Sequence, residues 1–392
     1  MATKLIGFTI DNGGSSLRVL PLDRSETVPV TDSIIEFDNE FYKIPVDVFR
    51  PKNVDDKRAF ISIIDAPNAN YKGMYAVGIT GRMYSGKLLP LNPHDRKSES
   101  ENFYLQLIFD VAQGIIRRRE FALIDSEYGT EVCDDELKLD YLAIIGTNIP
   151  IGEHTSDKDM VGTLKQAVCG HYKVSFPLID GTPTISFEIR AEYFGVLPEG
   201  GVVVSSLGSR IRPDMYSMVI DIGHISSDIS IYYGKHLDGK SYLSSTAAGT
   251  TLMSLVQRQL EDDGYRVNAA MVQMALETGC IKNGTDLIDV ADPVRRAQRD
   301  FISNYLHADF INLMQRANVI AEQIDVLVPV GMPMNQVDGL EYLPEVVKED
   351  LGMRNVQVLT NCEDARYANL LAIEKFTNAL MAKARTSIGS VE

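Results

Sequence analysis

The sequence has no tryptophan, and only four cysteines and six histidines among its 392 residues. The cysteines, at Cys133, Cys169, Cys280 and Cys362, form no Cys-x-x-Cys pair. This spacing argues against a disulfide framework or a zinc site, and it is typical of a reducing cytoplasm. The histidines lack metal-ligand spacing, and the chain contains no His-Glu-x-x-His motif.

Long apolar runs and positive charge are also scarce. No apolar stretch approaches the roughly 20 residues of a membrane-spanning helix, and the short apolar run that reaches Asp11 does not resemble a signal peptide. Acidic residues number 54 against 38 basic ones, which gives a formal net charge of −16. Because binding to phosphate backbones needs clustered Lys and Arg, we expect no membrane contact and no direct binding of nucleic acid.

The length of the chain and its 45% apolar content predict two or three domains with substantial cores. Strands are expected at the start of each half and helices after them, an order that favours an α/β architecture. The expected helices span about 100–118, a segment starting near Ser156, 249–262, 267–278, 291–318 and 364–384.

One pattern occurs twice. LIGFTIDNGGSSLRVLPLDR (5–24) and MVIDIGHISSDISIYYGK (218–235) align Asp11 with Asp221 and Arg18 with Asp228. In each copy an apolar strand ends at an acidic residue, passes through glycine, and resumes as a second alternating strand. We therefore expect two β-hairpins rather than strand-to-helix turns.

The composition of these turns indicates a chemistry. Glycine lets backbone N–H groups approach an anion closely, and hydroxyls at Ser15, Ser16, Ser226 and Ser227 could add donors. A nearby carboxylate would repel bare phosphate, but it suits Mg²⁺ held through water. Ordinary β-turns would explain a single copy, since Asp-x-Gly is common in turns. Two copies in two similar halves favour a clamp for a magnesium-bound nucleotide.

Other phosphate motifs fit poorly. GRMYSGKL (81–88) approaches the P-loop pattern, but Leu88 replaces the metal-binding hydroxyl, and Pro90 and Pro93 exclude a following helix. No Gly-x-Gly-x-x-Gly opens a helix after a strand, which disfavours a dinucleotide-binding fold.

TIDNGGSSLRVL and VIDIGHISSDIS resemble the two phosphate loops of the actin-like ATPase superfamily. Segments 147–176, 75–81 and 361–376 resemble the plasmid-segregation actins of the ParM type. The resemblance implies an actin-like ATPase fold of the α/β class, with two duplicated ribonuclease-H-like domains around a nucleotide cleft. Domain I would comprise 1–152 and 361–392, with a small subdomain inserted at about 32–100. Domain II would comprise 153–360, with a small subdomain at about 236–325.

The same resemblance implies roles for individual residues. Glu153 would position or deprotonate the attacking water with help from Asp228, and Asp11 and Asp221 would hold Mg²⁺ through waters. Gly249 and Thr250 would approach the ribose, Gln273 and Glu277 the base or sugar, and Gly331 and Met332 the base. The phosphate loops would consist of Asp11, Asn12, Gly13, Gly14, Ser15, Ser16 and Arg18 in the first, and Asp221, Gly223, His224 and Ser226 in the second.

The sequence departs from the superfamily pattern at three places. Arg18 stands where many relatives have Lys, and a planar guanidinium is not equivalent to an ammonium. His224 replaces a glycine of the second loop, and VGMPMN (330–335) stands where two or three glycines are common. The change at 330–335 leaves the contacts to the base, and hence the choice between ATP and GTP, open.

The function implied is a cytoplasmic, filament-forming protein that hydrolyses ATP or GTP with Mg²⁺. Its partners would be further copies of itself and a ParR-like DNA-binding adaptor that links the filament to plasmid DNA. Two alternatives stay open. A small-molecule kinase of the same fold would need a catalytic Asp where Glu153 stands, and a scaffold would bind nucleotide without hydrolysing it.

Overall fold

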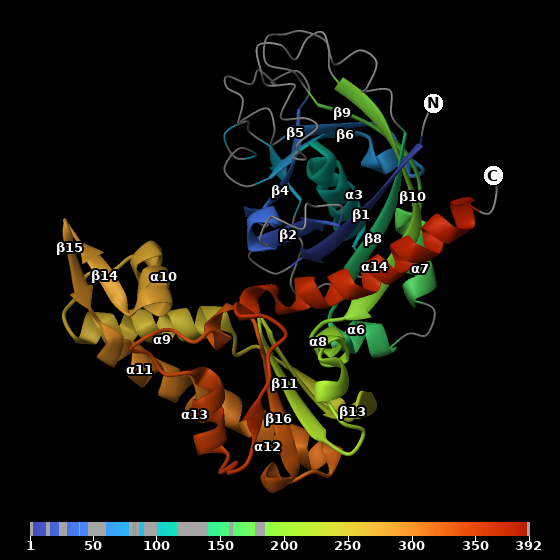
Figure 1. Ribbon diagram of the computed structural model, residues 1–392. Helices are drawn as coiled ribbons and strands as arrows, with labels where there is room; N and C mark the ends of the chain where they lie inside the picture. The colour runs from blue at the N-terminus through green and yellow to red at the C-terminus, as the bar shows by residue number, and fades with distance from the viewer. Residues whose placement is uncertain are drawn as a thin grey trace. The chain divides into compact units, whose positions relative to one another are not determined.

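The computed structural model of the protein divides into two compact units (Figure 1). Unit 1 comprises Met1–Ile149, Ser156–Leu197 and Ile373–Glu392, and unit 2 comprises Pro150–Thr155 and Pro198–Ala372. The structure describes residues 3–12, 16–22, 30–38, 40–45, 60–77, 81, 83, 86–89, 100–116, 140–156, 160–176 and 185–389.

Unit 1 is built on a ten-stranded sheet with the order β3-β2-β1-β8-β10-β9-β5-β6-β4-β7. β1 pairs antiparallel with β2 and parallel with β8. The strands are β1 (Thr3–Asn12), β2 (Ser16–Pro21), β3 (Ile35–Asp38), β4 (Phe41–Ile44), β5 (Phe60–Asp65), β6 (Gly73–Val77), β7 (Lys87–Leu88), β8 (Asp140–Ile149), β9 (Gly170–Phe176) and β10 (Ile185–Pro198).

Helices cover both faces of the β1–β8 region. On one face, α3 (Glu101–Ile116) packs so closely that a Cβ added at its Gly114 would lie 2.4 Å from the Phe8 ring. On the other face, a Cβ added at Gly7 would lie 2.4 Å from Met381 of α14 (Ala368–Gly389). Glycine therefore permits both helices to approach the sheet. Unit 1 also contains η1 (Thr31–Ser33), η3 (Ala69–Tyr71) and α7 (Met160–Val168).

Unit 2 repeats the strand order around its own first strand. Its sheet runs β13-β12-β11-β16-β17, in which β11 pairs antiparallel with β12 and parallel with β16. Both units thus have the same order of strands around the first strand. On one side lie its hairpin partner and a third antiparallel strand, and on the other side lies a parallel strand. The strands are β11 (Tyr216–Ile222), β12 (Ser227–Tyr233), β13 (His236–Ser245), β16 (Ile324–Val330) and β17 (Gln357–Val358), with a separate hairpin of β14 (Cys280–Asn283) and β15 (Asp286–Asp289).

The helices of unit 2 supply most of its core. α11 (Ala291–Asp300), the π-helix η6 (Phe301–Leu306) and α12 (His307–Ala317) follow one another without a break, and Phe301 and Phe310 are fully buried. The other helices are α6 (Ile151–Ser156), α8 (Gly201–Ser206), η5 (Gly208–Arg210), α9 (Gly249–Asp262), α10 (Ala269–Thr278), η7 (Ala321–Gln323), η8 (Met332–Met334), α13 (Leu343–Asp350) and η9 (Ala365–Tyr367).

Most expected elements are found, with one correction. Both hairpins are antiparallel, α9 has the predicted bounds, and the helix expected over 291–318 ends at Ala317. A helix was expected to start near Ser156, but Ile151–Ser156 already form the short helix α6 directly after Pro150, and α7 comprises Met160–Val168. The division into domains I and II stays a prediction. It assigned the residues of β9 and β10 to domain II, and these strands lie in the sheet of unit 1.

Within the described residues, Cys169, Cys280 and Cys362 are free thiols, and Cys133 lies outside that part of the chain. The described helices include none that is both long enough and apolar enough to cross a bilayer.

Asp110, on α3, is an ionisable residue in the core of unit 1. It is fully buried, and neither carboxyl oxygen has a hydrogen-bond partner among the described residues. Burial raises the pKa of Asp110 well above its usual value, because the apolar surroundings penalise the ionised form. Asp110 therefore favours the protonated state in the folded protein.

We predict that Asp110→Asn stabilises the protein increasingly as pH rises. The folded-state pKa lies above the unfolded-state value, so the parent loses stability from about pH 4 up to the raised pKa, whereas asparagine does not ionise. In urea unfolding from pH 4.5 to 8.5, the gap in unfolding free energy should widen by up to about 1.4 kcal/mol per pH unit. Asp286→Asn, at an exposed position, is the control. A gap that stays constant or favours the parent would contradict this.

Candidate functional site

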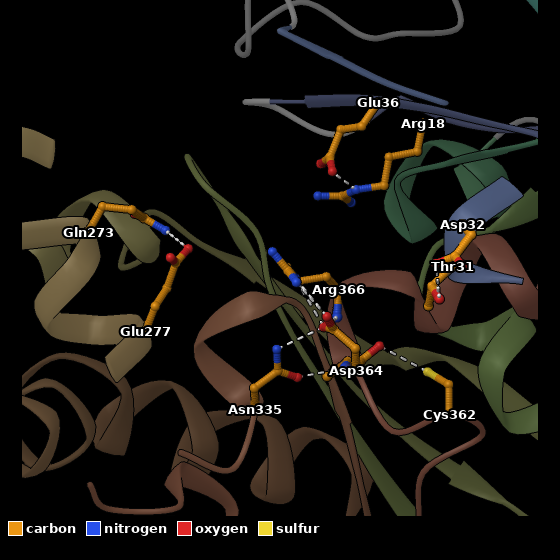
Figure 2. A network of polar contacts seen from close by, with 11 residues as sticks. Arg18, Thr31, Asp32, Glu36, Gln273, Glu277, Asn335, Cys362, Asp364 and Arg366 are labelled. Carbon is orange, nitrogen blue, oxygen red and sulfur yellow. Dashed lines mark hydrogen bonds and ion pairs between the residues drawn. The ribbon is translucent and has the colours of Figure 1, made fainter. Parts of the chain in front are cut away.

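The first hairpin carries a row of charged side chains across three strands. Asp11 on β1 lies opposite Arg18 on β2, and Arg18 lies opposite Glu36 on β3, so all three project from one face. Arg18 Nη1 is 3.4 Å from Asp11 Oδ2. Arg18 Nε is 2.9 Å from Glu36 Oε1, a contact that Figure 2 shows. Asp11 is only 6% exposed. The guanidinium therefore links two carboxylates, one of them buried.

A second contact fixes the other oxygen of Asp11. Asn148, near the end of the parallel strand β8, donates from Nδ2 to Asp11 Oδ1 at 2.9 Å. Of the remaining residues predicted for the first loop, Asn12 is buried and Ser16 is half-buried at the start of β2. Gly13, Gly14 and Ser15 lie outside the described residues.

The second hairpin repeats this register with different charges. Asp221 on β11 lies opposite Asp228 on β12, and Asp228 lies opposite Ser244 on β13. Two carboxylates directly across a strand pair repel each other, so each needs a donor. Ser244 Oγ donates to Asp228 Oδ1, and Asn369 Nδ2 donates to Asp221 Oδ2 at 2.9 Å. This face of unit 2 thus holds two adjacent carboxylates, each with an uncharged donor.

The start of α9 holds the second loop in place. Gly249 N donates to Gly223 O at 2.9 Å, and Thr250 N donates to His224 O at 2.9 Å. The N–H groups of these two residues bind the loop carbonyls, and their predicted approach to the ribose stays a prediction. Gly223 N closes the turn by donating to the carbonyl of Ser226 at 3.0 Å.

One predicted hydroxyl donor of this loop has an internal role. Ser227 was expected to add a donor at the loop tip, but it is fully buried and its Oγ donates to Ala247 O at 2.6 Å. Ser226 is exposed, so the two neighbouring hydroxyls have different surroundings.

Helix α6 brings Glu153 to the face that carries the two aspartates. A Cβ added at Gly152 would lie 3.3 Å from the ring of Tyr242 on β13. Tyr242 lies two residues from Ser244 along β13, so both side chains project from the same face. Glu153 itself is half-buried in the first turn of α6, where its N–H donates to Pro150 O at 3.0 Å. Glu153, Asp221 and Asp228 therefore belong to one side of the unit 2 sheet.

Gly331 follows β16 in a conformation that favours glycine. Its φ is +94°, and an added Cβ would lie 2.2 Å from Ile222 O, at the end of β11. Its N–H donates to Ala365 O at 2.9 Å. Met332 begins η8 immediately afterwards. Gly331 thus joins the ends of two strands to the segment that precedes α14.

An ion pair organises the segment after Gly331. Asn335 Nδ2 donates to Asp364 Oδ1 at 2.8 Å, and Arg366 Nη2 donates to Asp364 Oδ2 at 2.6 Å (Figure 2). Burial works against ionisation of Asp364, but the hydrogen bonds from Arg366 and Asn335 outweigh it and lower its pKa. Asp364 is thereby held as a carboxylate.

Gln273 and Glu277, the candidates for base or sugar contacts, lie one turn apart on α10. Gln273 Nε2 donates to Glu277 Oε1 at 2.7 Å (Figure 2). Such i, i+4 pairs are common on helix surfaces, so this contact alone indicates no ligand.

The donors present suit magnesium better than a softer metal. No group of three or more His, Cys, Asp or Glu able to hold a metal occurs within the described ranges. Asp11 and Asp221 offer carboxylate oxygens, each held by an amide, as expected of carboxylates that bind Mg²⁺ largely through its waters.

The two residues that orient the aspartates, Asn148 and Asn369, were not predicted from the sequence. Asn148 ends the apolar run LAIIGTN, and a buried amide there must find a partner, so this signal was available. Asn369 carries no comparable signal, because it comes 148 residues after Asp221.

The two units, with the same strand order and the same hairpin register, define the actin-like ATPase fold, and solved structures confirm it. The chain is similar to the actin-like protein Alp7A (TM-score 0.70, 13% identity, covering 99% of this chain and 100% of that one). It is similar to the archaeal actin homolog Ta0583 (TM-score 0.66, 16% identity, 95% and 99%) and to apo pSK41 ParM (TM-score 0.63, 12% identity, 98% and 100%).

Other solved structures of such proteins contain nucleotide or are assembled. Ta0583 has been solved in complex with ADP, and a Bacillus thuringiensis ParM with AMPPNP. A ParM from Clostridium botulinum forms a 15-stranded filament. No described protein family and no curated protein matches the sequence.

We predict that Gly331→Ala destabilises the protein more than Gly208→Ala. Both glycines have positive φ, but an added Cβ at Gly208 (φ +65°) would have nothing within 4 Å. Gly208→Ala should cost about 1 kcal/mol of unfolding free energy, and Gly331→Ala about 3 kcal/mol because it also meets the Ile222 carbonyl. Urea unfolding measures both. Equal losses would show that the contact with Ile222 is not rigid.

Proposed function

We propose that the chain is an actin-like protein that polymerises with ATP or GTP and Mg²⁺, hydrolyses the nucleotide slowly, and moves plasmid DNA in the cytoplasm through a ParR-like DNA-bound adaptor. One observation carries this proposal. Each unit presents a strand-end carboxylate in a hairpin of the same register, Asp11 opposite Arg18 and Asp221 opposite Asp228, and an asparagine amide orients each carboxylate.

Phosphoryl transfer depends mainly on positioning and charge stabilisation. We assign these tasks to different residues of the chain. Asp11 and Asp221 would hold Mg²⁺ through its waters, and the ion would supply positive charge beside the phosphates. Arg18 provides a cation for phosphate oxygens. Glu153 orients the attacking water, and Asp228 assists. The remaining contacts come from the loop residues Asn12, Gly13, Gly14, Ser15, Ser16, Gly223, His224 and Ser226, and from Gly249, Thr250, Gln273, Glu277, Gly331 and Met332.

We expect copies of the chain to associate through head-to-tail contacts. Head-to-tail contacts between different surfaces do not close on themselves and so produce helical filaments. The ParM of Clostridium botulinum is an example of a filament on this fold. The net charge of −16 supports an adaptor, rather than the filament itself, as the part that binds DNA.

Light scattering, followed together with phosphate release, tests the proposal. The purified protein should scatter more after Mg-ATP or Mg-GTP is added, and the signal should decay as phosphate appears. EDTA should abolish both signals. Transfer of phosphate to a small molecule without scattering would instead indicate a kinase, and retained nucleotide without hydrolysis would indicate a scaffold.

We predict that Glu153→Ala slows hydrolysis by about 100-fold or more, because a positioned general base contributes that much. The variant should still bind nucleotide and polymerise, and its filaments should persist for longer in the scattering assay. Glu322→Ala, on the exposed surface of η7, is the matched control. Hydrolysis at the parent rate would remove Glu153 from the mechanism.

We predict that Asp221→Ala weakens binding of Mg-nucleotide by about 10- to 100-fold, since it removes a carboxylate that holds the ion's waters. Calorimetry with and without Mg²⁺ measures this. The loss should appear only with Mg²⁺ present, and Asp214→Ala, an exposed aspartate of the same unit, should bind like the parent. An equal loss in EDTA would mean that Asp221 acts on something other than the metal.

A further inference from the structure

Asn369 lies in the first turn of α14 and uses both ends of its amide. Its Nδ2 donates to Asp221 Oδ2 at 2.9 Å, and its Oδ1 accepts from Gly200 N at 3.0 Å. The residue is only 7% exposed. The orientation of this amide is fixed, because a flip would place Oδ1 against a carboxylate and Nδ2 against an N–H group. Asn369 therefore joins α14, the turn before α8 and the end of β11.

The contact matters because Asp221 already faces a like charge. Asp228 lies directly opposite on β12 and is 9% exposed, whereas Asp221 is half-buried, so water screens the repulsion between them only in part. The amide of Asn369 supplies a donor to one oxygen of Asp221 and adds no charge to the pair.

Unit 1 contains a counterpart at the same point of its hairpin. Asn148 donates to Asp11 Oδ1 at 2.9 Å. Its own Oδ1 is buried without a hydrogen-bond partner in the part of the chain that the structure describes, so the bond to Asp11 alone sets the direction of the amide. The two asparagines come from different elements, β8 and α14, and yet meet equivalent aspartates.

We propose that Asn369 and Asn148 are positioning residues for the metal-binding aspartates. Each amide binds one carboxylate oxygen and holds the carboxylate in one orientation, so that its other oxygen can hold the waters of a magnesium ion. This inference rests on the proposed function. It assigns the orientation of the aspartate in each hairpin to an asparagine from another element.

Asn369→Asp tests the role of the amide donor. At pH 8 the introduced carboxyl adds a third negative charge beside Asp221 and Asp228, and affinity for Mg-AMPPNP or Mg-GMPPNP should fall by about 10- to 100-fold. At pH 6 a proton shared between the introduced carboxyl and Asp221 can replace the amide donor. Most of the affinity should then return. Asn369→Ala should also lose affinity but should not recover at pH 6.

Asn304→Asp is the matched control. Asn304 is exposed on η6, and its amide also donates to an aspartate, Asp300. This control variant also replaces asparagine by aspartate and so adds the same charge to unit 2. It should bind the magnesium-bound nucleotide analogue like the parent at both pH values. Thermal unfolding of every variant reports whether the fold is kept. If Asn369→Asp does not fold, Asn148→Asp repeats the test in unit 1, with a smaller loss because Arg18 offsets the added charge.

The outcomes separate this inference from the proposed function. If the parent binds neither nucleotide with Mg²⁺, the proposed function is contradicted and the inference falls with it. If the parent binds and Asn369→Asp binds equally at pH 6 and 8, the inference alone is overturned. A folded Asn369→Asp that binds weakly without recovery at pH 6 also overturns it, because the amide would then act through packing rather than as a donor.

Discussion

A carboxylate at the end of a strand needs hydrogen-bond donors that hold its oxygens in one orientation. This requirement applies in both halves of the molecule, because Asp11 and Asp221 each accept from an amide that belongs to an element outside their own strand. β8 supplies one through Asn148, and α14 supplies the other through Asn369. The parallel strand β8 and the start of the last helix thereby each contact one of the two aspartates, although they are remote from the hairpins in sequence.

The two hairpins differ in the charge of the residue that lies opposite the strand-end aspartate. In unit 1 the row across the strands alternates as Asp11, Arg18 and Glu36, so the cation already balances the buried carboxylate. In unit 2 the row is Asp221, Asp228 and Ser244, and the donors seen at the two carboxylates, Ser244 and Asn369, are uncharged. The duplicated hairpin has therefore diverged in charge at the position opposite the aspartate, where unit 1 has Arg18 and unit 2 has Asp228.

The hairpins were predictable from sequence because their signals are local. An acidic residue and a glycine between alternating strands fix the turn, and strand periodicity then sets Asp11 opposite Arg18 and Asp221 opposite Asp228. The asparagine contacts were not predictable, because partners 137 and 148 residues apart meet only through the sheet order and the path of α14. Helix α6 was missed for a local reason. Pro150 reads as a loop residue in sequence, but its carbonyl accepts from the N–H groups of Glu153 and His154 and so begins the hydrogen bonding of α6.

Our central claim is that both units bind one magnesium-bound nucleotide through equivalent aspartates. The most direct test is a crystal structure of the protein with Mg²⁺ and a non-hydrolysable ATP or GTP analogue. We predict that Asp11 and Asp221 each lie within about 5 Å of one ion and contact its waters. A nucleotide bound away from the hairpins, or an ion that only one aspartate approaches, would contradict the claim.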